Sequence, residues 1–124
     1  MSKLSMRFVF TALLAGSGIA TAQTYPSRPI TMIVPFAAGG PMDVVGRVVA
    51  DRMRAALGQA IVVENVAGAG GSIGVGRVAR AAPDGYTLSY GGWPTHVING
   101  AAQSLSYDLL GDFEPVAMTA SDRG

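Results

Sequence analysis

The stretch ITMIVPFAAGGPMD, residues 30–43, decides how this chain folds. Its first five residues, Ile30 to Val34, are mostly apolar and lie between two prolines, which is typical of a strand buried on both faces of a parallel sheet. A glycine-rich loop follows, and then Pro41 and Asp43 suit the first turn of a helix. The stretch therefore predicts a strand, a loop and a helix in direct succession.

The predicted helix should end at Gly58, because glycine readily adopts the left-handed conformation that closes a helix. Apolar residues recur at helical spacing along it and should face the core, whereas Arg47, Asp51 and Arg54 mark the opposite face. The positions expected on the apolar face are Val45, Val48, Val49, Met53, Ala56 and Leu57.

Two more strands are expected downstream, at residues 61–63 and 87–90. Between them, Ser72 is expected to cap a helix that continues through Ala81. This alternation of strands and helices, with connections long enough for parallel pairing, predicts an α/β fold with right-handed crossovers.

Turns and loops make up much of the remaining sequence. Pro83-Asp84-Gly85 predicts a turn, because proline presets one backbone angle and glycine supplies a positive one. Residues 99–111 are expected to form loops and short turns, and residues 115–119 are a candidate fourth strand.

The composition limits the function. Of the 124 residues, 49% are hydrophobic and 14% are charged, so the chain should pack one modest core. Nine basic residues face eight acidic ones; without Lys3 and Arg7 the balance is seven to eight, or −1, which gives no basic face for nucleic acid. The absence of cysteine excludes disulfides, thiolate metal sites and a lipid-modified N-terminal cysteine.

Residues 1–22 are expected to form a signal peptide. Lys3 and Arg7 precede a short apolar run, and Ala20-Thr21-Ala22 supplies the small residues that signal peptidase reads. Cleavage is predicted between Ala22 and Gln23, which would release residues 23–124 into a bacterial periplasm. No later stretch is typical of a transmembrane span.

Three glycine-rich loops are expected at one edge of the sheet, at residues 35–43, 65–72 and 91–95. In an α/β sheet the loops that follow the strands emerge at the same edge, where ligands bind. Glycine lets the backbone approach a ligand closely and point its N–H groups outward, and a helix N-terminus adds partial positive charge. The edge therefore favours a small anion, although each loop taken alone is also a common turn.

Little in the sequence supports catalysis or a cofactor. A Walker loop needs a lysine that is absent after Lys3, and the Gly-x-Gly-x-x-Ala pattern at residues 74–79 falls inside a predicted helix. His96 is the only histidine and is interpreted as a surface or pocket-edge residue, and neither Ser72 nor Ser89 lies in a Gly-x-Ser-x-Gly elbow. The sequence predicts no metal, no cofactor and no enzyme.

Several motifs together resemble one known family. The chain is similar to the tripartite tricarboxylate transporter substrate-binding proteins, or Bug family of extracytoplasmic solute receptors, from about Tyr25 to Ser121. The motifs that carry the resemblance are Tyr25-Pro26-Ser27-Arg28-Pro29-Ile30, Val34-Pro35-Phe36-Ala37-Ala38-Gly39-Gly40, Met42-Asp43, Val63-Glu64-Asn65, Gly68-Ala69-Gly70-Gly71-Ser72-Ile73-Gly74 and Ala82-Pro83-Asp84-Gly85-Tyr86-Thr87-Leu88.

The resemblance implies a parallel-sheet lobe of a type II periplasmic binding protein. Such a receptor closes two lobes around a small organic carboxylate and delivers it to a membrane permease with one large and one small subunit. The resemblance implies that the ligand is held mainly by backbone groups and water. The ligand-binding residues it implies are Phe36, Ala37, Ala38, Gly39, Gly40, Met42, Asp43, Gly70, Gly71, Ser72, Trp93, Pro94 and Thr95.

The chain departs from the family in two respects. Val66-Ala67 stands where the family often has Arg-Pro, and the chain has about a third of the family's mature length. Residues 23–124 are therefore expected to form only the first part of lobe 1, ending near the hinge crossover, with the second lobe absent. An exported α/β enzyme and a single-lobe interaction module stay open as alternatives.

Overall fold

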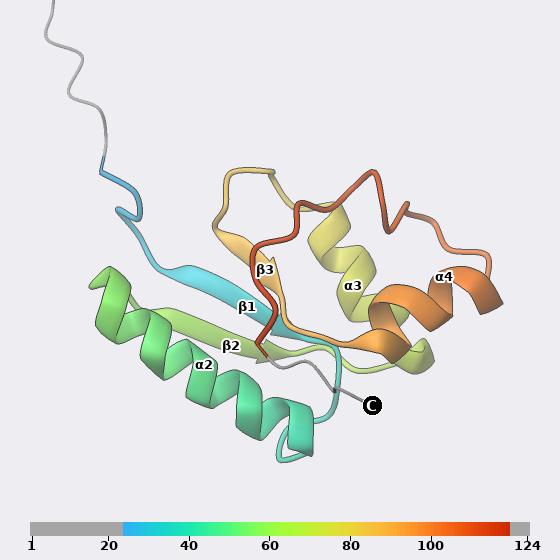
Figure 1. The fold of residues 1–124 in the computed structure, drawn as a ribbon, viewed down its shortest axis with the longest axis horizontal. Coiled ribbons are helices and arrows are strands. Elements are labelled where there is room, and N and C mark those ends of the chain that lie inside the picture. Colours follow the sequence, from blue (N-terminus) through green and yellow to red (C-terminus); the bar gives the residue numbers. More distant parts are fainter. Residues whose placement is uncertain (1–23, 120–124) are drawn as a thin grey trace, which may run out of the picture.

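The structure is a computed structural model that describes residues 24–119 (Figure 1). The expected signal peptide, residues 1–22, and its cleavage site lie outside the described residues. No helix within residues 24–119 is both long enough and apolar enough to span a bilayer.

A three-stranded parallel sheet forms the centre of the described region, as the sequence predicts. Strands β1 (Ile30–Val34), β2 (Ile61–Asn65) and β3 (Thr87–Ser89) are arranged in the order β2-β1-β3. In the register, Val34 pairs with Asn65 and Ile33 pairs with Ser89, so the three strands end almost level. The loops that follow the three strands therefore all begin at the same edge of the sheet.

The core is centred on β1. Ile30, Met32, Ile33 and Val34 are all at most 2% exposed, although successive side chains point to opposite faces of the sheet. Both faces of β1 are therefore covered, which confirms the strand buried on both sides that the apolar run predicts.

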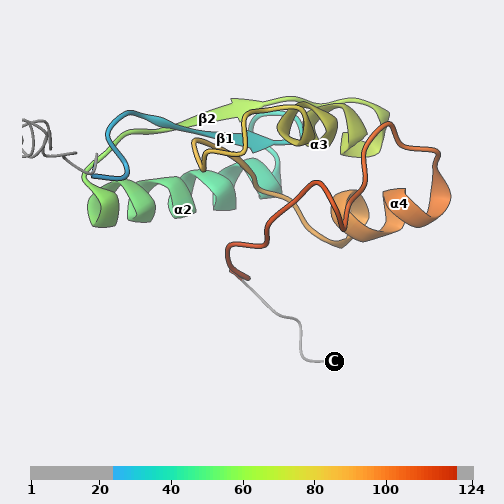
Figure 2. The same ribbon diagram turned by 90° about the horizontal axis from the view of Figure 1, so that it is seen from above.

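Helix α2 (Pro41–Leu57) ends at Gly58, which has a φ of 68°, as expected from the sequence. Figure 2 shows α2 running along one side of the strands. The expected buried face is wrong in part, because Val45, Val48 and Leu57 are 47%, 57% and 38% exposed.

Small residues explain this difference. The buried positions of α2 are Asp43, Gly46 and Ala50. A Cβ at Gly46 would lie 3.1 Å from Val34 Cγ2 and 3.2 Å from a ring carbon of Tyr90. The helix packs closely against β1 at Gly46 and Ala50. With this side of the helix turned toward the sheet, Val45 and Val48 are left exposed to solvent.

Helix α3 (Ser72–Ala79) follows a short 3-10 turn, η1 (Ala69–Gly71). The prediction that Ser72 is the N-cap is wrong, because the cap is Gly71 and Ser72 is the first helical residue. The Ser72 hydroxyl instead donates to the Ala69 carbonyl at 2.9 Å. The helix also ends two residues before Ala81.

The segment after β3 is more helical than expected. A π-helical turn, η2 (Pro94–Ile98), continues into the short helix α4 (Asn99–Ala102), where only loops and turns are predicted from residue 99. The predicted turn at residues 83–85 is confirmed, with a φ of 79° at Gly85.

The candidate strand at residues 115–119 is wrong. This segment has no strand assignment and lies outside the sheet, with Val116 and Met118 both 79% exposed. Within residues 24–119 the sheet consists of β2, β1 and β3, so this segment pairs with none of them.

The close approach of α2 to β1 leads to a test. Replacing Gly46 with valine should destabilise the fold by about 1–3 kcal/mol, because the added methyl groups overlap Val34 and Tyr90. Urea unfolding followed by circular dichroism measures the change. Val48→Ala on the exposed face of the same helix is the control and should stay within about 0.5 kcal/mol; equal stability of both variants would contradict the packing described.

Candidate functional site

The three glycine-rich loops meet at Gly71. A Cβ at this position would lie 3.2 Å from the Pro35 carbonyl oxygen and would overlap the Thr95 methyl group. Pro35 begins the loop after β1, Gly71 ends the loop after β2, and Thr95 belongs to the segment after β3. The three loops therefore lie together at the edge predicted from the sequence, with Gly71 close to both of the other loops.

A buried side-chain amide links the second loop to the helical segment that follows the third loop. Asn99, in α4, is 7% exposed and donates from Nδ2 to the Gly70 carbonyl at 2.8 Å. Gln103 Nε2 donates to Asn99 Oδ1 at 3.3 Å and holds the amide in this orientation. The short helix α4 thus helps to fix the second glycine loop.

The first loop, residues 35–40, is held by a buried acid. Asp43, in the first turn of α2, is 3% exposed and accepts the Gly39 N–H at 2.8 Å. Arg47, one turn along the helix, and Asn65, at the end of β2, also contact this carboxylate. The hydrogen bonds from Arg47, Gly39 and Asn65, in that order of size, lower the pKa of Asp43 to about 2. The carboxylate is therefore charged at neutral pH.

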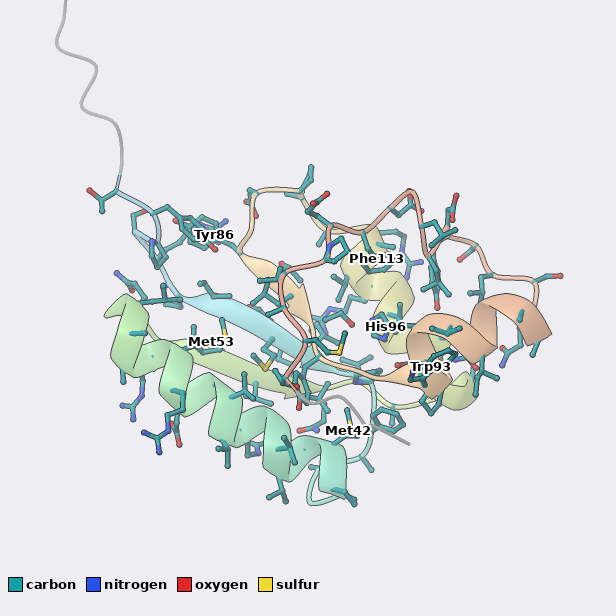
Figure 3. The ribbon with its side chains drawn as sticks, viewed as in Figure 1. Met42, Met53, Tyr86, Trp93, His96 and Phe113 are labelled. Atoms are coloured by element: carbon teal, nitrogen blue, oxygen red, sulfur yellow. The ribbon has the colours of Figure 1, made fainter. Side chains whose placement is uncertain are left out.

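The only histidine of the sequence, His96, directly follows the third loop. His96 Nε2 lies 3.0 Å from Ser89 Oγ, and His96 Nδ1 lies 2.8 Å from Thr95 Oγ1. Its ring also meets Phe113 edge-on, with 6.1 Å between ring centres (Figure 3). The ring is half-buried rather than at the surface, and burial lowers the pKa of His96.

The contacts of His96 form a structural bridge between β3 and the third loop. A Ser–His–Asp triad needs a carboxylate on the second ring nitrogen, to orient the ring and stabilise its charged form. Here a hydroxyl, that of Thr95, occupies this position, and it also contacts the Gly92 backbone. Within residues 24–119, no three His, Asp or Glu side chains gather in a group that could hold a metal ion.

The edge offers backbone dipoles to a ligand. Ala37, Ala38 and Gly39 are exposed at the N-terminal end of the 17-residue helix α2, where the aligned peptides produce a partial positive charge. The guanidinium of Arg47, in the second turn of the same helix, is already paired with Asp43. The arrangement therefore suits a small anion bound mainly by N–H groups.

The predicted ligand residues differ in their surroundings. The backbone of residues 36–40, 70–72 and 93–95 belongs to the three loops that meet at this edge. Met42 is half-buried, the Trp93 side chain is 72% exposed, and Asp43 is buried with its oxygens occupied. Contact of these residues with a ligand stays a prediction.

Sequence reasoning missed three polar residues that shape the edge. Arg47 is assigned to the solvated face of its helix, and Asn65 and Asn99 receive no role of their own. The position of Asn65, at the end of a strand and before a glycine-rich loop, is the one signal that could have indicated a role at the edge.

Comparison with known proteins gives three findings. Residues 45–122 match the family described as the tripartite tricarboxylate transporter family receptor. The protein BugT of Bordetella pertussis is 45% identical over 123 residues, which is 95% of this chain and 38% of BugT. The chain spans somewhat more than a third of the length of such curated relatives.

Solved structures of two proteins are also similar to this chain. MatC from Rhodopseudomonas palustris, solved with bound malate, is 47% identical, with a TM-score of 0.71 over 74% of this chain and 32% of MatC. The periplasmic binding protein BugD is 60% identical, with a TM-score of 0.51 over 52% of this chain and 22% of BugD. The α/β lobe expected from the sequence is therefore confirmed as the lobe type of periplasmic binding proteins.

The contact at Gly71 predicts a local cost. Gly71→Ala should destabilise the fold by about 1–2 kcal/mol through its positive φ and by about 1–3 kcal/mol more through overlap with Thr95 and Pro35. Gly58→Ala is the matched control, because Gly58 also has a positive φ but a Cβ there would meet nothing within 4 Å. Urea unfolding of both variants checks the difference, and an equal loss would contradict the close meeting of the loops.

Proposed function

Because this chain belongs to the tripartite tricarboxylate transporter receptor family, we propose that its glycine-lined edge binds a small organic carboxylate for transport. The family match confirms the resemblance drawn from the sequence motifs. Since the chain spans little more than a third of BugT, the activity of the whole receptor is part of this proposal.

The meeting of the three loops around Gly71 is the observation that carries the proposal. It places the first-loop backbone, the N-terminus of α2 and the segment containing Thr95 around one edge. Backbone N–H groups and a helix end are well suited to a carboxylate, whose charge they meet without a buried lysine or arginine. The malate in MatC is a ligand of this chemical class.

The periplasm is the proposed location, and a permease with one large and one small subunit is the proposed partner. The signal-peptide pattern at residues 1–22 supports export. The similarity to BugD, a periplasmic binding protein, supports the same compartment. The family's description as a transporter receptor supports transfer of the carboxylate to such a permease.

The proposal also takes the chain to be a receptor without catalytic activity. The Ser89–His96 contact is the strongest feature in favour of a hydrolytic enzyme. His96 is better explained as a bridge, since its other nitrogen contacts a hydroxyl that is itself bonded to the Gly92 backbone.

Binding to the chain alone should be weak. Residues 24–119 provide one wall of the site, and receptors of this kind gain affinity by closing two walls around the ligand. We expect a Kd no tighter than about 1 mM, near −4 kcal/mol.

The proposal predicts where malate binds. In an NMR titration of the ¹⁵N-labelled chain, the largest shift changes should come from amides at residues 36–40, 70–72, 92, 93 and 95, with a Kd in the millimolar range. Malate diamide, which has a similar shape but no charge, is the control and should leave these amides unmoved at equal ionic strength. Absent or scattered shifts with malate would overturn the proposed site, and a micromolar Kd would contradict the weak binding expected of one wall.

A further inference from the structure

We propose that Asp43, Arg47 and Asn65 form a clamp that positions the first loop for an anion without contacting the ligand. This inference rests on the proposed carboxylate-binding function. It changes the role of Asp43 from a ligand contact to a positioning residue, and it gives Arg47 and Asn65 a role that the sequence motifs did not indicate.

The bonds of Asp43 show why it is a poor ligand contact. Arg47 Nε lies 3.0 Å from one carboxylate oxygen of Asp43 and 3.1 Å from the other. The first oxygen also accepts from Asn65 Nδ2 at 2.9 Å, and the second accepts from Gly39 N–H at 2.8 Å. With the residue 3% exposed, both oxygens are engaged within the protein.

The clamp holds the first loop at two points. Asp43 fixes the amide of Gly39, near the end of the loop, and Asn65 Nδ2 also donates to the carbonyl of Phe36, near its start, at 3.1 Å. Arg47 Nη2 donates to Asn65 Oδ1 at 3.0 Å and thereby closes the ring of bonds. Side chains from α2 and β2 thus fix a loop of which Ala37 to Gly39 lie exposed to solvent.

Charge balance is the second contribution of the clamp. An acid at the N-terminus of α2 would repel an incoming carboxylate and compete with it for the positive end of the helix. Arg47 offsets that charge, because its guanidinium pairs with the Asp43 carboxylate at 3.0 Å. Arg47 therefore favours anion binding through Asp43 rather than by direct contact.

Arg47→Gln tests the clamp, with Arg54→Gln as the matched control. Both changes remove one positive charge from an exposed arginine of the same helix, and among residues 24–119 Arg54 pairs with exposed Asp51, at 3.4 Å. If the loop keeps its binding geometry in about a tenth of the Arg47→Gln molecules, the Kd for malate weakens about tenfold. Arg54→Gln should change the Kd for malate less than twofold.

The Gly39 amide supplies a readout that needs no ligand. In the unmodified chain, Asp43 stays charged at pH 3, so the Gly39 amide shift should be constant from pH 6 to pH 3. A lowered pKa means that the stabilisation from charged Asp43 is fully present above 3.8 and is lost as the pH falls through about 2. In Arg47→Gln the transition should move up toward 3.8, because the hydrogen bond that lowers the pKa of Asp43 most is lost.

The outcomes separate the clamp from the proposed function. Equal malate affinities for Arg47→Gln and Arg54→Gln, with an unchanged Gly39 transition, overturn the clamp. If the unmodified chain shows no malate shifts, the proposed function fails, and the Gly39 transition still decides whether the Asp43–Arg47 pair holds the loop.

Discussion

The backbone at Gly71 leaves no room for a side chain, and this close approach brings the three loops of the binding edge together. On one side stands the Pro35 carbonyl and on the other the Thr95 methyl group. Parallel strands that end level bring the loops to the same edge, but only a residue without a Cβ lets them touch. The same constraint sets the start of α3, because Gly71 in its left-handed conformation is the N-cap of that helix.

In the proposed anion site, partial charges take the place of a dedicated cation. Peptide N–H groups and the end of α2 supply partial positive charge, and the one acid in the first turn of that helix is neutralised by Arg47 and buried. Because backbone groups exist at every position, such a site leaves little side-chain record of its ligand. This is why the proposal names the class of ligand, a small carboxylate, and no individual compound.

The strands, α2 and the three loops could be predicted from the sequence, because each is marked by local signals such as the apolar run at residues 30–34, Pro41 and Gly58. The buried face of α2 could not be predicted from the sequence. Whether the valines or Gly46 face the sheet depends on how closely the helix approaches β1, which no local signal indicates. The roles of Asn65 and Asn99 also could not be predicted from the residues next to them in the sequence. Their amides bond to partners 22 to 29 residues away, and only the tertiary register brings those partners within reach.

A crystal structure of the chain soaked in malate is the most direct test of the binding edge. The structure should show a malate carboxylate against the backbone amides of Ala37 and Ala38, next to Gly71 and Thr95, with the Gly39 amide still bound to Asp43 and Asp43 still paired with Arg47. Malate bound elsewhere, or loops that lie apart with no contact between Gly71, Pro35 and Thr95, would contradict it.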